Sequence, residues 1–85
     1  MKSFEYVIKD SLGIHARPAG MLVKEVKKYE SKITIAKDGK EIDASKLMAL
    51  MALAVKCGNN VTITCDGADE ETACTELLQF FEENL

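Results

Sequence analysis

The chain has 85 residues, of which 47% are hydrophobic, and its formal net charge at pH 7 is −3. This length predicts one domain, over residues 1–85, whose small core leaves little room for an internal cavity, so we expect function on the surface. The negative net charge does not favour nucleic-acid binding, and no stretch approaches the ~18 apolar residues of a membrane span. Because residues 1–5 also lack the apolar run of a signal peptide, a cytoplasmic protein is expected.

The three cysteines favour neither a disulfide framework nor a metal site. Cys57, Cys65 and Cys74 are odd in number, form no CxxC pair and have only one histidine in the chain to assist them. We therefore expect buried or half-buried structural thiols, with no metal and no cofactor.

The first half of the chain predicts a strand, a helix and a hairpin. Apolar side chains occupy every second position from Phe4 to Ile8, which is the pattern of a strand that covers a core. From Ala16 to about Tyr29 the apolar residues recur at helical spacing. Segments 32–36 and 40–43 flank an Asp-Gly pair at 38–39, and such a pair readily supplies the positive φ angles of a tight turn.

The second half predicts a helix, a strand and a final helix. Residues from Ser45 to about Ala54 are too rich in leucine and methionine for a strand, so we expect a short helix with Ser45 as its cap. Segment 61–65 alternates as a strand, and Asp69 is the expected N-cap of the last helix. The element order is then β-α-β-β-α-β-α, which predicts a sheet with helices on one face.

His15, the one histidine, lies in the sequence GIHARPA at residues 13–19. If a helix begins just after His15, the unpaired backbone N–H groups of Ala16 and Arg17 lie beside the imidazole and form a site for an anion. Pro18 fits the first helical turn, where its missing N–H would have no partner. A neutral ring nitrogen could then attack a phosphoryl group while Arg17 and the helix N-terminus hold the negative charge.

Spacing alone does not decide this role, because a solitary histidine near a helix start is more often a cap or an ordinary surface residue. The sequence GIHARPA, however, resembles the active-site signature of the HPr family, the histidine-containing phosphocarriers of the bacterial phosphoenolpyruvate-dependent sugar phosphotransferase system. The resemblance extends over the whole chain and includes the Asp-Gly pairs at 38–39 and 66–67 and the Leu/Met-rich segment from residue 47.

The resemblance implies an α+β fold, an open-faced β-sandwich in which a four-stranded antiparallel sheet carries three helices on one face. It also implies that enzyme I phosphorylates Nδ1 of His15 and that enzyme IIA domains of sugar permeases receive the group. A protein of this kind is not an enzyme with turnover of its own but a covalent relay between two enzymes.

A docking surface is expected on the segment after Ser45, because a ten-residue helix cannot easily bury five large apolar side chains. We expect Leu50 and Leu53 to be buried, and Leu47, Met48 and Met51 to form an exposed surface, the Leu/Met patch, that adapts to successive partners. Family members dock through this helix and the start of the first one. A positive rim is expected from Arg17, Lys24, Lys27 and Lys46.

Lys46 departs from the family pattern. In many Gram-positive members this position is a serine phosphorylated by HPr kinase, and lysine carries the opposite charge and cannot accept that phosphate. Ser45 lies one residue away, but a shift of one residue rotates a helical side chain by ~100°, so a capping role is favoured over a regulatory one.

Two other interpretations remain open on the sequence. The chain could be a paralogue that serves a nitrogen-related or dihydroxyacetone-related phosphorelay, in which His15 would work identically. It could also be a regulatory binding module whose affinity is switched by phosphorylation. A monomer would suit a carrier that presents one face to several partners.

Overall fold

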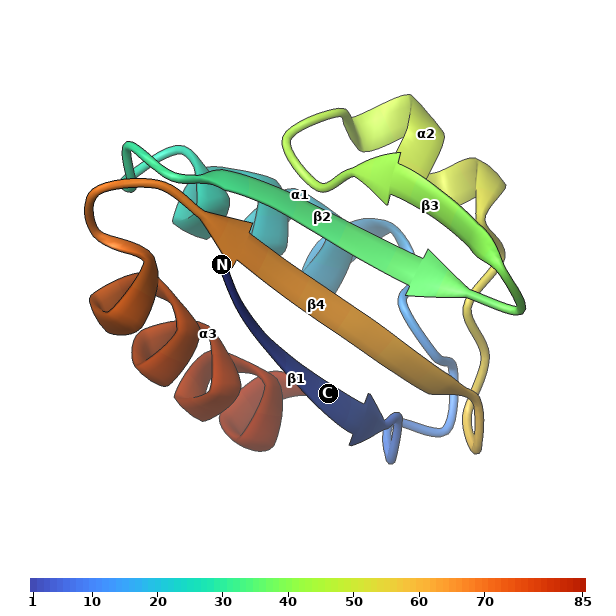
Figure 1. Cartoon of the computed structure of the whole chain (residues 1–85). Helices are drawn as coiled ribbons and strands as arrows, with labels where there is room; N and C mark the ends of the chain where they lie inside the picture. The colour runs from blue at the N-terminus through green and yellow to red at the C-terminus, as the bar shows by residue number, and fades with distance from the viewer.

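A computed structural model describes residues 1–85, and its seven elements follow in the predicted order (Figure 1). They are β1 (Lys2–Val7), α1 (Ala16–Val26), β2 (Lys32–Lys37), β3 (Lys40–Asp43), α2 (Leu47–Ala52), β4 (Asn60–Asp66) and α3 (Glu70–Asn84).

The four strands form one antiparallel sheet in the order β1-β4-β2-β3. The register pairs Ile63 of β4 with Phe4 on one side and with Ile35 on the other. Alternate residues of these strands point into the core, whereas the intervening threonines, such as the paired Thr34 and Thr64, line the opposite face. Figure 1 views the sheet from this open face, with α1 running behind it. The expected open-faced β-sandwich is confirmed.

Phe81 anchors α3 to the sheet. Its ring is fully buried and meets the rings of Phe4 and Tyr6 edge-on, with centroid separations of 5.8 Å and 5.5 Å. Edge-to-face pairs of this kind add to the energy of burial. The helix is thereby fixed across β1, which leaves α1 and α2 to form the other half of the helical layer.

Two helices are shorter than the sequence predicts. The first ends at Val26 instead of Tyr29, because Lys28 and Tyr29 donate to carbonyls three residues back and tighten the chain into a turn. The second covers Leu47–Ala52 instead of 45–54. It ends where Ala54 adopts a left-handed φ of 54°, a conformation that cannot continue a right-handed helix.

Ser45 does not cap α2, so that prediction is wrong. The N-cap is Lys46, which makes no side-chain capping bond. The Ser45 hydroxyl and backbone N–H donate instead to Asp43 Oδ1, at 2.7 Å and 2.8 Å, and these two bonds lower the pKa of Asp43. The side chain is turned back toward β3, where its hydroxyl donates to the charged Asp43 carboxylate, and such charge-assisted bonds are stronger than neutral ones.

Lys37 holds the other end of α2. Its Nζ donates to the carbonyl oxygens of Leu53 and Ala54, at 3.2 Å and 2.9 Å. Carbonyls at a helix C-terminus lack helical partners and carry partial negative charge, so a cation there is favourable. The strand thus helps to fix the position of the short helix.

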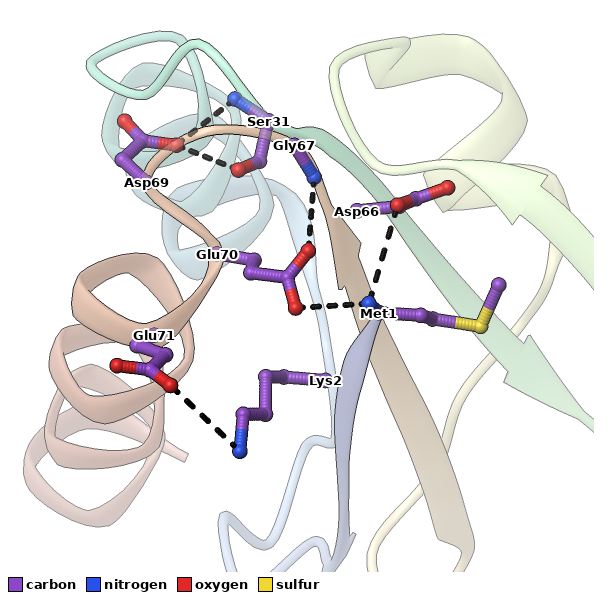
Figure 2. Close-up of polar contacts among 8 residues, drawn as sticks. All are labelled: Met1, Lys2, Ser31, Asp66, Gly67, Asp69, Glu70 and Glu71. Carbon is purple, nitrogen blue, oxygen red and sulfur yellow. Dashed lines mark hydrogen bonds and ion pairs between the residues drawn. The ribbon is translucent and has the colours of Figure 1, made fainter.

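Asp69 occupies the predicted N-cap position of α3, but its side chain does not cap that helix. The carboxylate accepts the N–H groups of Glu30 and Ser31, both at 2.9 Å, and the Ser31 hydroxyl. Figure 2 shows Asp69 reaching across to Ser31 while the neighbouring Glu70 accepts the N–H of Gly67. Asp69 therefore joins the turn after α1 to the start of α3.

Acid is expected to weaken this link. The hydrogen bonds from the Ser31 hydroxyl and the Glu30 N–H lower the pKa of Asp69 below the ordinary value of an aspartate. A lowered native pKa contributes stability above the ordinary value, and this contribution is lost as the pH falls below about 4 and through the native pKa. Urea unfolding at pH 6 and at pH 3 should show a smaller acid loss for Asp69→Asn than for the wild type. Asp66→Asn is the control, and equal losses in all three proteins would contradict the prediction.

Candidate functional site

His15 lies at the start of α1, as the sequence predicts. It is the N-cap residue, in an extended conformation (φ −91°), and its side chain makes no capping hydrogen bond and is 37% exposed. Ala19 is the first residue whose N–H bonds within the helix, to the His15 carbonyl at 2.9 Å. The N–H groups of Ala16 and Arg17 therefore have no helical acceptor, and both residues are exposed. The helix N-terminus is open to an anion beside the imidazole.

Gly13 sets the path of the chain into this site. It is buried with a φ of +69°, and its N–H donates to the Asp10 carbonyl at 2.9 Å. The next N–H, of Ile14, donates to the Val55 carbonyl at 3.0 Å. A Cβ on Gly13 would overlap that carbonyl and lie 2.6 Å from the Cα of Lys56. Only glycine allows the loop to pack so closely here.

A shallow surface depression surrounds the imidazole. The structure brings His15 and Arg17 together there, and no ion pair in the protein involves Arg17. Its guanidinium is exposed and can turn toward an anion at the ring. The depression is lined by Asp10, His15, Arg17, Pro18, Met21 and Asn84.

Asp10 and Asn84 are members of this depression that sequence reasoning missed. Asp10 Oδ2 lies 3.7 Å from His15 Nε2. Asn84 comes from the last turn of α3, and its side-chain amide donates to the Phe80 carbonyl at 3.0 Å. A turn signal at Asp10–Gly13, just before the histidine, could have pointed to Asp10. Nothing in the sequence links Asn84 to a residue 69 positions away.

The split predicted for α2 is confirmed. Leu50 and Leu53 are buried, whereas Met48 is 80% exposed and Leu47 and Met51 are also exposed. These exposed side chains lie on α2, which packs against α1, the helix that His15 precedes. Two further exposed apolar residues, Leu12 and Met21, were missed; they come from the His15 loop and from α1.

The lysines of the expected positive rim are all exposed. Lys46 stands at the start of α2. At a rise of 1.5 Å per residue, Lys24 and Lys27 lie ~13 Å and ~18 Å beyond His15 along α1. Arg17 is therefore beside the histidine, whereas Lys24 and Lys27 lie farther along the helix.

The prediction for the cysteines holds for two of the three. Cys65 is buried, which raises the pKa of its thiol to about 11, and Cys74 is half-buried. Cys57 is exposed, contrary to expectation. It lies in a tight turn closed by the bond from the Lys56 N–H to Asn59 Oδ1 at 2.7 Å, and its Sγ lies 3.8 Å from the Lys9 carbonyl oxygen.

Comparison with known proteins agrees with this geometry. Residues 2–83 match the sequence model of a family described as the PTS HPr component phosphorylation site. The chain belongs to the HPr family. The phosphocarrier protein HPr of Mycoplasma genitalium is 42% identical over 85 residues, which cover 99% of this chain and 97% of that protein. Members of this family are bacterial phosphocarriers of the phosphotransferase system.

Solved HPr structures share the fold. The crystal structure of HPr from Thermoanaerobacter tengcongensis aligns with a TM-score of 0.93 at 38% identity, over 98% of this chain and 93% of that one. Crh of Bacillus subtilis, described as a swapped, intertwined dimer, aligns with a TM-score of 0.78 at 34% identity, over 100% and 98% of the two chains. Within this chain, the helices are all too short or too polar to cross a membrane.

Proposed function

We propose that this chain is a single-domain phosphocarrier of a sugar phosphotransferase system. Its His15 accepts a phosphoryl group from phosphorylated enzyme I and passes it to enzyme IIA domains of sugar permeases. The observation that carries the proposal is the placement of a half-exposed imidazole at the open N-terminus of α1, with Arg17 in the same depression. The protein acts as a covalent relay without turnover of its own.

The chemistry needs one nucleophile and a place for negative charge. The lone pair of Nδ1 attacks phosphorus, and the departing bond leaves its electron pair on the donor. The N–H groups of Ala16 and Arg17 and the Arg17 guanidinium then stabilise the phosphoryl oxygens. Because all these groups lie at the surface, a second protein can approach the same phosphorus and reverse the step.

Incubation with enzyme I and phosphoenolpyruvate tests the proposal. Intact-mass measurement should show the gain of one acid-labile phosphoryl group, and addition of a sugar-specific enzyme IIA domain should remove it. No gain, or a gain that survives acid, would contradict a phosphohistidine. A group accepted from enzyme I but delivered only to nitrogen-related or dihydroxyacetone-related acceptors would favour the paralogue instead.

The Leu/Met patch is proposed as the docking surface. Met48→Asp places a charge on its most exposed member, so transfer from enzyme I should slow about tenfold, which corresponds to ~1.4 kcal/mol. Stopped-flow or quench assays at low carrier concentration measure the rate. The control is Thr72→Asp, an exposed residue in the first turn of α3, where the same charge is tolerated. If both variants transfer at wild-type rates, docking does not use the patch.

Regulation by HPr kinase is expected to be absent. Lys46 cannot accept phosphate, and the Ser45 hydroxyl is half-buried and bonded to Asp43. Incubation with HPr kinase and ATP should therefore leave the mass unchanged. Lys46→Ser is the matched variant that should gain a phosphoryl group, while stable labelling of wild-type Ser45 would overturn this expectation.

A regulatory binding module is the second candidate, and the likeness to Crh is the observation that favours it. Such a module would need no transfer to enzyme IIA. A wild-type protein that is phosphorylated by enzyme I but never delivers the group would support this second candidate.

We propose a monomer as the working carrier, and sedimentation or size-exclusion analysis tests that state.

A further inference from the structure

Asp10 places a carboxylate against the imidazole on the side away from the proposed nucleophile. Its Oδ2 lies 3.7 Å from Nε2 of His15, the ring nitrogen that the proposed transfer does not use. The contact is longer than a hydrogen bond, but both side chains are partly exposed, at 27% and 37%, and a small rotation of either closes the gap. Functional hydrogen bonds are often long in an unliganded protein and tighten in the complex.

The Asp10 carboxylate is itself held in place. Its second oxygen, Oδ1, accepts the N–H of Leu12 at 2.9 Å, and its backbone carbonyl accepts the N–H of Gly13 at 2.9 Å. These two bonds close the turn that leads into His15. The side chain is therefore oriented by the same loop that carries the histidine.

We propose that Asp10 is a positioning residue that keeps the His15 proton on Nε2 and so leaves the lone pair on Nδ1. This inference rests on the proposed function. A neutral imidazole carries its proton on one nitrogen only, and an ionised carboxylate can only accept a hydrogen bond. The nitrogen that faces Asp10 is therefore the one that holds the proton, and the other is the nucleophile.

The same contact helps during transfer. When the Nδ1 lone pair forms the bond to phosphorus, the bond from phosphorus to the donor breaks with its electron pair staying on the donor. The ring then carries a positive charge, with its proton still on Nε2 toward Asp10. When the phosphoryl group leaves, the bonding pair returns to Nδ1 and the ring is neutral again. No proton has to be gained or lost, and Asp10 stabilises the charged form in between.

Arg17 and Asp10 have different roles in this proposal. Arg17 and the helix N-terminus address the phosphoryl oxygens, whereas Asp10 faces the other nitrogen of the ring. Asp10 lines the same depression as Arg17, but it approaches the imidazole at Nε2 and not at the proposed nucleophile, Nδ1.

Asp10→Asn in the full chain tests the inference. The amide oxygen can still accept the Leu12 N–H, but the amide N–H₂ facing the ring favours a lone pair on Nε2 and a proton on Nδ1. Imidazole ¹⁵N shifts at pH 8 should place the wild-type proton on Nε2 and move it toward Nδ1 in the variant. Phosphoryl uptake should fall about tenfold or more, both from enzyme I and from phosphoramidate, a small donor that needs no docking.

Asp38→Asn is the matched control, because it removes the same charge from the hairpin tip, where Asp38 has a φ of 52° that asparagine also tolerates. It should change neither the tautomer nor the rate. Asp10→Ser, which keeps an acceptor for Leu12 without the amide donor, separates damage to the turn from the effect on the tautomer.

The outcomes separate this inference from the proposed function. A wild-type protein with its proton on Nδ1, or an Asp10→Asn variant with unchanged tautomer and unchanged uptake, would overturn the positioning role alone. A wild-type protein that accepts no phosphoryl group would remove the proposed function and this role with it. If Asp10→Asn failed to fold, the wild-type tautomer and the tautomer and uptake rate of Asp10→Ser would still test the positioning role.

Discussion

His15→Ala is expected to abolish phosphoryl uptake while leaving the fold intact. Alanine removes the only imidazole of the chain, and with it the proposed nucleophile. The structural cost should be below ~1 kcal/mol, because the side chain is partly exposed, makes no capping bond and has a long polar contact of 3.7 Å with Asp10. Intact-mass analysis after incubation with enzyme I and phosphoenolpyruvate measures the first effect, and urea unfolding measures the second.

His15→Gln is the companion variant, because it keeps a polar side chain at the helix start but has no nucleophilic nitrogen. It should also remain unlabelled. Uptake by either variant at the wild-type level would show that another residue carries the group. A large loss of stability in both would mean that His15 supports the fold, which its exposure argues against.

The alternating and helical patterns of the sequence were sufficient to predict all seven elements. In strands such as 61–65 every second residue is buried, so the local sequence pattern is enough to predict the strand. The end of α2 was harder to predict, because it also involves a contact distant in sequence. The Lys37 amine that holds the end of α2 belongs to β2, and no local pattern reports it.

Polar side chains near helix starts were the main source of error. Ser45 and Asp69 both have the residue type of a cap, yet each bonds to another partner, Asp43 and the Glu30–Ser31 backbone respectively. Residue propensity indicates only that such side chains often form hydrogen bonds with nearby backbone groups. Which group they choose depends on the tertiary structure.

In the candidate site, too, the predictable residues are those adjacent in sequence, whereas the others are brought in by the fold. His15, Ala16 and Arg17 were predictable, because they are adjacent in sequence and share one helix start. Asp10 joins them through a turn, and Asn84 joins them only because α3 ends beside that turn. Motif and resemblance therefore identified the part of the site that is continuous in sequence, and the structure supplied the rest.

Gly13→Ala is expected to be the most destabilising change near the site. A left-handed φ costs a residue with a side chain ~1–2 kcal/mol, and forcing a methyl group against packed backbone adds ~1–3 kcal/mol. Both costs apply here, since Gly13 has a φ of +69° and its Cβ would lie 2.6 Å from the Cα of Lys56. Urea unfolding should show a loss of ~2–5 kcal/mol.

Two other glycines separate the two costs. Gly39 has a φ of +80° with nothing near its Cβ position, so Gly39→Ala should show the backbone cost alone. Gly20 lies within α1 with open space around it, so Gly20→Ala should stabilise the protein by up to ~1 kcal/mol. Equal effects at Gly13 and Gly39 would mean that contact with residues 55–56 carries no cost.

The change at Gly13 should also reach the chemistry. To relieve the overlap, the loop must move away from Val55, which stretches the bond from the Ile14 N–H and shifts His15 relative to the N-terminus of α1. Phosphoryl uptake by the fraction that is still folded should then fall, because the imidazole and the free N–H groups no longer face one anion. Gly39→Ala, which carries the backbone cost but has nothing near its Cβ position, should keep its uptake rate. A Gly13→Ala protein that is destabilised yet transfers at the wild-type rate would show that the loop holds the fold but does not aim the histidine.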